Sequence, residues 1–241
     1  MRAPNAAELL GVWERFGALG PTERADALLG LALPGEHASD LPVGERDAHL
    51  LELRKLLFGS SFDGAAECVR CGEPVEYSLS AETLAAERDR ALPDDALELS
   101  VFGHELRFRL PTGADLAAAA SAADVAGART ALLERCVVSA TVDGREEAAA
   151  SLPAPVAAAL SERLAQSDRL ADVQLALTCP ACGCAWTVVL DVGAWLWSEL
   201  ESWARRTVLD VHALASAYGW SEAEILALGP RRELYLELIE R

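Results

Sequence analysis

The chain has 241 residues, of which 51% are hydrophobic and 24% are charged. It is therefore long enough to bury a core, and its composition is that of a globular rather than a disordered protein. The formal net charge of -17 at pH 7 repels phosphate backbones and anionic lipid, which argues against nucleic acid and membrane and for proteins as partners. The alternative, that the acidity only keeps the protein in solution, stays open.

The first residues do not resemble a secretion signal. An amphipathic segment follows Met1 almost directly, without a charged end and a central apolar stretch. No apolar run approaches the roughly 18 residues that span a bilayer. We therefore expect a cytoplasmic protein, in which six cysteines indicate metal or thiol chemistry rather than disulfides.

The N-terminal region predicts helices with turn residues between them. Three helices are expected, one led by Asn5 and two over residues 22–31 and 44–58. Asn5 with Glu8 three residues later is a capping box that opens the first helix. In the third helix, Arg46 and Arg54 are expected on the solvent side, opposite a leucine-rich face.

The middle of the chain mixes strand and helix patterns. Strands are expected over residues 74–79, 97–101, 105–110, 173–177 and 185–190, and helices over residues 112–138 and 153–166. Residues 81–90 indicate a polar helix or loop. Phe102-Gly103-His104 connects two of the strands into a hairpin, and Thr112 with Asp115 is a capping box.

The last part of the chain is predicted to be helical. Apolar residues recur at helical spacing over 195–218, and Gly219 is a stop signal. Ser221 with Glu224 is a further capping box, and a last helix is expected from Pro230. These patterns divide the chain into a helical region over residues 1–60, a region of strands with inserted helices over residues 61–192 and a second helical region over residues 193–241. The three regions can also be parts of a single domain.

Two short cysteine motifs organise the whole sequence. Cys68-Val69-Arg70-Cys71-Gly72 and Cys179-Pro180-Ala181-Cys182-Gly183 are both C-x-x-C-G knuckles, and a strand-like run follows each of them. One knuckle supplies two thiolates, so that two knuckles complete a tetrahedral zinc site. The predicted ligands of one structural zinc ion per chain are Cys68, Cys71, Cys179 and Cys182. We therefore expect an α+β fold, mainly helical, around a small antiparallel β core that a zinc-ribbon-like site closes.

The alternatives to a structural zinc site are a redox dithiol and a catalytic zinc ion. A single C-x-x-C pair can be a redox dithiol, but neither pair lies at the start of a helix in a βαβ pattern. A catalytic zinc needs an open coordination position, which four thiolates do not leave. Cys184 is a spare thiol beside the second knuckle, and Cys136 is expected to be a small buried residue of a helix.

Signatures of enzymes are missing from the sequence. His104-Glu105 begins like a metalloprotease helix, but Phe108 stands where the second histidine belongs. There is no phosphate-binding glycine loop, dinucleotide fingerprint or G-x-S-x-G motif. The histidines are scattered and are expected at the surface or at helix caps. We therefore expect neither an enzyme nor a small-molecule substrate.

Several stretches resemble the T4-like baseplate hub assembly chaperone family of contractile, phage-tail-like injection systems. They are 41–47, 50–54, the first knuckle with its strand, 108–116, 133–136, 179–183, 218–226, Arg231-Arg232 and Tyr235-Leu236. The resemblance covers most of the chain from about residue 40 and is most specific near the C-terminus. It implies a non-enzymatic role in building the baseplate hub, or in forming part of it, with hub proteins as partners.

The C-terminal helices are rich in aromatic residues, which are enriched at protein interfaces. Among them, Trp197, Trp220 and Tyr235 are predicted to reach the partner, with burial in the core as the alternative. A second function, a zinc-ribbon regulator that binds nucleic acid or polymerase, would require a basic surface near the knuckles. Arg70 stands there among acidic residues, so this second function is disfavoured.

Overall fold

The computed structural model describes residues 1–35, 37–80, 84 and 97–239. The chain is α+β, as its sequence predicts, and divides into two compact units. The first unit combines residues 1–36 with 193–241, and the second comprises residues 37–192. The polar helix or loop expected over residues 81–90 lies outside the described residues, except for Leu84, which has a helical backbone conformation.

The described residues of the first unit form helices and their connections. These helices are α1 (Ala6–Phe16), α2 (Pro21–Ala32), α8 (Val192–Tyr218), α9 (Glu222–Leu226) and α10 (Arg231–Ile239). Val192, the first residue of α8, belongs to the second unit. Both predicted caps are present: the Asn5 side chain accepts from the Glu8 N–H, and that of Ser221 accepts from the Glu224 N–H. Gly219 follows α8 with φ of +70°, a conformation that glycine adopts without strain.

The core of the first unit is aliphatic. Leu28 and Leu29 of α2, Leu200 and Leu214 of α8, and Ile225 of α9 have no exposed surface. Burying each such side chain contributes about 1.5–3 kcal/mol relative to leaving it in water. Packing of these apolar faces, rather than helix propensity, therefore holds the first unit together.

The second unit places helices beside small antiparallel sheets. Its helices are η1 (Ala38–Asp40), α3 (Val43–Phe58), α5 (Gly113–Ala119), α6 (Val125–Cys136), η2 (Ala149–Ser151), α7 (Ala154–Ser167) and η3 (Arg169–Asp172). Its strands are β1 (Ser61–Glu67), β2 (Pro74–Ser80), β3 (Leu97–Val101), β4 (His104–Phe108), β5 (Val137–Val142), β6 (Arg145–Glu146), β7 (Gln174–Thr178) and β8 (Ala185–Val189). Within the described residues, the strands form three sheets, ordered β1-β2, β3-β4-β5-β6 and β7-β8.

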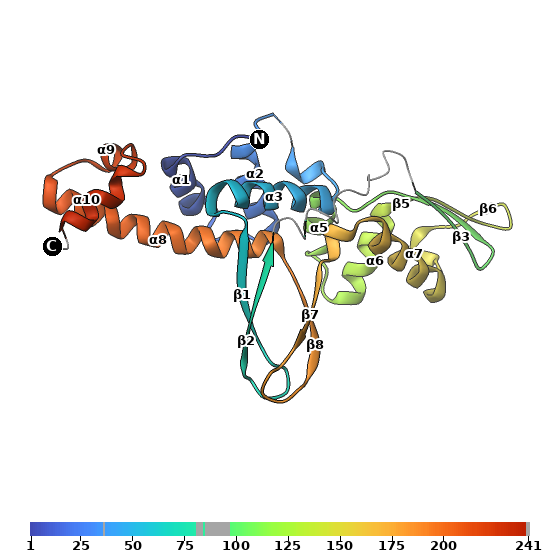
Figure 1. The fold of residues 1–241 in the computed structure, drawn as a ribbon. Helices are drawn as coiled ribbons and strands as arrows, with labels where there is room; N and C mark the ends of the chain where they lie inside the picture. Colours follow the sequence, from blue (N-terminus) through green and yellow to red (C-terminus); the bar gives the residue numbers. More distant parts are fainter. Residues whose placement is uncertain (36, 81–83, 85–96, 240–241) are drawn as a thin grey trace. The chain divides into compact units, whose positions relative to one another are not determined.

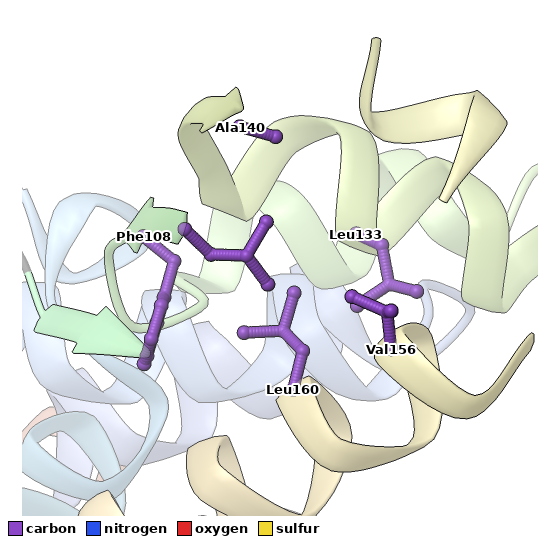
Figure 2. Packing of buried hydrophobic residues seen from close by; sticks show 6 residues of the cluster. Phe108, Leu133, Ala140, Val156 and Leu160 are labelled. Carbon is purple, nitrogen blue, oxygen red and sulfur yellow. The ribbon is translucent and has the colours of Figure 1, made fainter. Parts of the chain in front are cut away.

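A hydrophobic cluster joins the four-stranded sheet to two helices. Figure 2 shows side chains from the sheet meeting side chains from α6 and α7. The cluster consists of Leu106, Phe108, Leu133, Ala140, Val156 and Leu160. The single helical region expected over 112–138 is two helices here, and its end turns into β5. Cys136 closes α6 with no exposed surface, as predicted.

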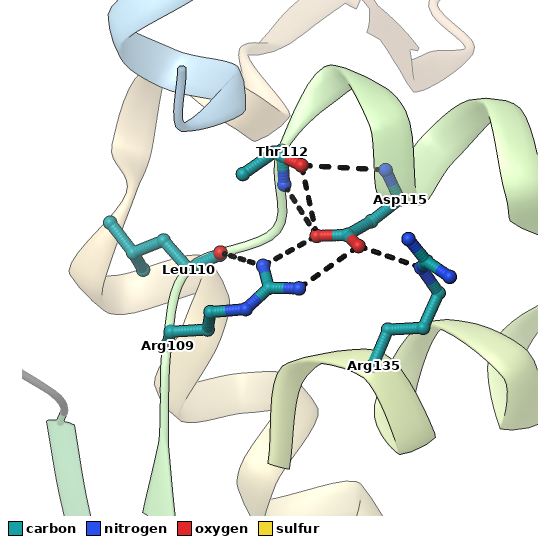
Figure 3. A network of polar contacts seen from close by, with 5 residues as sticks. All are labelled: Arg109, Leu110, Thr112, Asp115 and Arg135. Atoms are coloured by element: carbon teal, nitrogen blue, oxygen red, sulfur yellow. Dashed lines mark hydrogen bonds and ion pairs between the residues drawn. The ribbon is translucent and has the colours of Figure 1, made fainter. Parts of the chain in front are cut away.

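A carboxylate network ties β4, α5 and α6 together (Figure 3). Asp115 is 1% exposed and accepts hydrogen bonds from Arg109 Nη2 at 3.0 Å and Arg135 Nε at 2.7 Å. It also closes the predicted capping box, because its carboxylate accepts from the Thr112 N–H at 2.9 Å. Burial alone would raise the pKa of the Asp115 carboxyl. The hydrogen bonds from Arg109, the Thr112 backbone and Arg135 outweigh burial and lower this pKa below its usual range.

Two arginines of α3 lie inside the second unit rather than on its surface, which corrects the prediction. Arg46 is 6% exposed, and its Nε and Nη2 donate to Asp47 Oδ1 at 3.0 and 2.9 Å. Arg54 is 5% exposed, donates to the Gly59 carbonyl at 2.6 Å and lies 4.1 Å from the centroid of the Phe62 ring. Periodicity missed them because it does not show pairing: Arg46 pairs with the buried Asp47, and Arg54 contacts Gly59 and Phe62 beyond the end of the helix.

The hairpin predicted around Phe102-Gly103-His104 is present, but its turn is Phe102-Gly103 alone, because His104 already pairs with Val101. His104 was expected at the surface or at a cap but is 8% exposed. Its Nδ1 is 3.0 Å from the Phe102 carbonyl oxygen, and its Nε2 is 3.1 Å from Glu147 Oε2. The imidazole therefore connects the start of β4 with the segment that follows β6.

Candidate metal centre

Two β-hairpins of the second unit carry the four predicted ligands in their end loops. Cys68 and Cys71 lie between β1 and β2, and Cys179 and Cys182 lie between β7 and β8. Figure 1 shows the ends of the two hairpins meeting. The sequence predicts only the strand that follows the first knuckle. Because β1 precedes this knuckle and pairs with β2, the knuckle is the loop of a hairpin.

Both loops have the same backbone geometry. The Cys68 N–H donates to the Glu73 carbonyl at 2.9 Å, and the Gly72 N–H donates back to the Cys68 carbonyl at 2.9 Å. The second loop repeats both bonds at 2.9 Å, with Cys179, Cys184 and Gly183 in the corresponding places. The glycines have φ of +73° and +68°, a region that other residues rarely enter. The glycine after each C-x-x-C therefore lets the chain fold back beneath the sulfurs.

The four sulfur atoms converge across the two hairpins. Cys68 Sγ lies 3.7 Å from Cys182 Sγ, and Cys71 Sγ lies 3.6 Å from Cys179 Sγ. All four lie within 4.8 Å of one another. Tetrahedral Zn–S bonds of about 2.3 Å put sulfurs about 3.8 Å apart, whereas a disulfide needs about 2.05 Å. The arrangement therefore fits one metal ion bound by both hairpins.

The first cysteine of each loop faces inward. Cys68 is 3% exposed and Cys179 is 1% exposed, and both pack with Val75 in a small cluster that Trp186 covers in part. Cys71 is exposed. The centre thus has an apolar underside and one thiol open to solvent.

Four thiols this close perturb one another. The Arg70 backbone N–H, the largest influence, lowers the pKa of Cys68 to about 6. The Glu73 backbone N–H acts in the same direction on Cys71, but contacts with the other three thiols and burial outweigh it and raise the pKa to about 12. Neighbouring thiolates repel one another, so the set favours a cation that balances their charge.

The other cysteines stay outside the cluster. Cys184 directs its thiol toward the Ala185 carbonyl at 3.8 Å and packs against the cluster without joining it. Burial raises the pKa of the Cys136 thiol to about 11. Among the residues that the structure describes, the Cys68, Cys71, Cys179 and Cys182 set is the grouping of His, Cys, Asp and Glu suited to a metal.

Of the three residues predicted to contact a partner, Trp197, Trp220 and Tyr235, one is buried and two are partly exposed. Trp197 is 3% exposed, and the Arg24 guanidinium lies 5.0 Å from its ring centroid. This corrects its assignment, because an indole enclosed within the first unit cannot contact a partner. Trp220 and Tyr235 are half-buried and meet edge to face, with ring centroids 5.0 Å apart. Tyr218 stacks on Trp220 at 4.6 Å and is 39% exposed, so an aromatic cluster remains partly accessible there.

Comparison of the chain with protein-family models, curated proteins and solved structures found no match. In the described parts of the chain, no helix combines the length and apolar character needed to cross a membrane. The fold and the sulfur geometry together define an α+β protein with a four-cysteine site that can hold a metal ion.

Proposed function

We propose that the four clustered cysteines bind one structural zinc ion per chain. The observation that supports zinc is the pair of inter-hairpin sulfur separations, 3.7 and 3.6 Å, close to the edge of a ZnS4 tetrahedron. Four thiolates would fill the coordination shell and leave no position for water or substrate. The site is therefore assigned a structural role, and a non-enzymatic role for the protein is proposed from its resemblance to a non-enzymatic family.

The zinc would join two elements that are weak alone. An isolated two-stranded hairpin is marginally stable in water. Each short sulfur separation pairs one cysteine of the first hairpin with one of the second, so the bound ion would crosslink loops far apart in the sequence. We refer to residues 61–80 and 174–189 together as the zinc arm.

We propose that the zinc-bound protein helps to build the baseplate hub of a contractile, phage-tail-like particle, or is part of that baseplate. Support comes from the sequence resemblance, which includes the second knuckle and residues 218–226. The second of these stretches forms the end of α8, the cap of α9 and part of the aromatic cluster around Trp220 and Tyr235. Apolar surface that a hub subunit exposes before assembly would need such a partner.

The alternative, a zinc-ribbon regulator that binds nucleic acid or polymerase, lacks a supporting observation. Glu67, Glu73 and Glu76 lie around the first knuckle together with Arg70. This acidic surface repels phosphates, and binding to a nucleic acid normally requires a basic one.

Quantitative proteomics of purified particles and of the remaining lysate tests the baseplate role. A fixed small copy number in particles would identify a baseplate component, and a complex with a hub subunit in the lysate would identify an assembly chaperone. Absence from both fractions would overturn the proposed role. Tyr235→Ala should weaken binding to the hub subunit, whereas Leu209→Ala, at an exposed apolar position of α8, is the control.

A further inference from the structure

The turn at the end of the β3–β4 hairpin has an unusual residue. Phe102 and Gly103 form a two-residue turn with φ of +51° and +79°, and type I′ turns require positive φ at both central positions. Glycine enters this region freely, whereas a bulky residue there is an outlier. Phe102 therefore holds a backbone conformation that its side chain disfavours.

The neighbouring turn of the same sheet provides an internal comparison. Asp143-Gly144 is also a two-residue turn, with φ of +49° and +75°. His104 lies opposite Val142 in the antiparallel β4–β5 pair, so that both turns lie at one end of the sheet. Asp-Gly is among the pairs that type I′ turns prefer. Turn geometry therefore explains Asp143 but not Phe102.

Packing does not explain Phe102 either, because 70% of its surface is exposed. The turn is held from inside the sheet: the buried His104 ring contacts the Phe102 carbonyl through Nδ1 at 3.0 Å and Glu147 through Nε2 at 3.1 Å. Strained conformations that their surroundings hold in place cluster at functional sites. An exposed aromatic ring in a braced, strained turn is such a case.

We propose that Phe102 is an anchor residue for a protein partner that offers an apolar pocket with a basic rim. Exposed aromatic side chains that fill such pockets dominate the energy of many interfaces. The exposed charged residues on the two turns and the adjoining strand positions are Glu105, Asp143, Arg145 and Glu146. They are mostly acidic, so a basic rim complements them, and an anionic membrane does not. The proposed binding surface around Phe102 is separate from the zinc site, and the proposal depends neither on that site nor on the baseplate role.

Photo-crosslinking with the full-length chain in its host cell tests the location. The photoreactive analogue p-benzoylphenylalanine replaces Phe102, and in the matched control it replaces Val125, an 85% exposed residue of α6. We expect position 102 to crosslink one protein, within an apolar segment flanked by lysine or arginine, at least tenfold more than position 125. Equal yields, or crosslinks to lipid or to a second copy of this chain, would overturn the proposal.

The substitution Phe102→Asn then separates binding from folding. It should weaken the affinity for the crosslinked protein at least tenfold. The Tm should stay unchanged or rise by about 2–4 °C, since asparagine tolerates the turn conformation. Asp124→Asn, at the exposed N-cap of α6, should change neither quantity, because asparagine caps equally well. A lower Tm for Phe102→Asn would assign the ring to packing within the fold, and an unchanged affinity would also contradict the proposal.

Discussion

Asp115 shows how one carboxylate can hold three elements of the second unit together. It is buried and accepts hydrogen bonds from Arg109, Arg135 and the Thr112 backbone. We expect Asp115→Asn to lower the free energy of unfolding at pH 7 by about 2–3 kcal/mol, because charge-assisted hydrogen bonds contribute about 1.5–3 kcal/mol. Asp124→Asn is the matched control, since the exposed Asp124 caps α6 and asparagine caps equally well.

The same network predicts a pH dependence. The folded-state pKa of Asp115 is lowered, so its stabilisation is complete above the unfolded-state pKa near 4 and is lost as the pH falls through the folded-state pKa. The difference in unfolding free energy between wild type and Asp115→Asn should shrink between pH 7 and pH 3 in urea titrations. A constant difference would show that the charge of Asp115 does not contribute.

Asp47 should act in the opposite direction. Burial is the main cause that raises its pKa to about 6, despite the adjacent Arg46. An ionised Asp47 is therefore unfavourable above pH 6, and the penalty, on the order of 2 kcal/mol, is relieved as the pH falls from 6 toward 4. Relative to Asp47→Asn, the wild type should be more stable at pH 5 than at pH 7.5. The opposite order in urea titrations would mean that pairing with Arg46 outweighs burial.

At the scale of elements, the N-terminus of α3 depends on a contact with a distant segment. The Gly44 N–H donates to Asp168 Oδ2 at 2.9 Å, and an added Cβ would lie 1.6 Å from Asp168 Oδ1. Gly44→Ala should therefore displace the Asp168 carboxylate and lower the unfolding free energy by about 2 kcal/mol or more.

Gly30 in α2 is the matched control for Gly44. It is exposed, and its Cβ would meet nothing within 4 Å. Gly30→Ala should stabilise the protein by about 0.5–1 kcal/mol, because alanine favours helix more than glycine does. Thermal unfolding of both variants measures the contrast, and equal effects would rule out the contact with Asp168 as the cause.

Elements with strong local signals were predictable from the sequence. Capping boxes marked the starts of α1, α5 and α9, and alternation marked β3 and β4. β1 was missed because it contains glycine and alanine, and its extended form depends on β2: the ring of Tyr77 covers Gly64, where a Cβ would lie 2.6 Å from it. β5 was missed because a helical alanine pattern precedes it, whereas pairing with β4 determines its conformation.

The four-cysteine cluster that can hold a metal ion was predictable to the residue, because C-x-x-C-G spacing reflects local loop geometry. The position of Trp197 was not, because whether an aromatic ring is buried or exposed depends on packing within the unit. The same holds for Arg46 and Arg54, whose burial depends on their contacts with Asp47 and with the Gly59 carbonyl. Local chemistry thus predicted the site, whereas side-chain environments required the tertiary structure.

At the scale of the whole molecule, zinc removal should affect one part of the chain. Chelation should raise hydrogen exchange in the zinc arm, residues 61–80 and 174–189, because each hairpin would lose its crosslink. Exchange in α1 and α2 should stay unchanged, since their aliphatic core contains no metal ligand. Unfolding of the entire chain, or an unaltered zinc arm, would contradict this local role.

Two cysteine variants separate ligands from bystanders. Cys182→Ser should reduce the zinc content well below one per chain and reproduce the exchange pattern of the chelated protein. Cys184→Ser, two residues away, should keep the metal, because the Cys184 thiol lies outside the four-sulfur cluster. Equal metal loss in both variants would reassign the ligand set.

Zinc K-edge X-ray absorption on protein purified without chelator, together with its metal content, tests the proposed zinc site most directly. We expect one zinc per chain with four sulfur neighbours at about 2.3 Å. Nitrogen or oxygen ligands, or a protein without stoichiometric zinc, would contradict it.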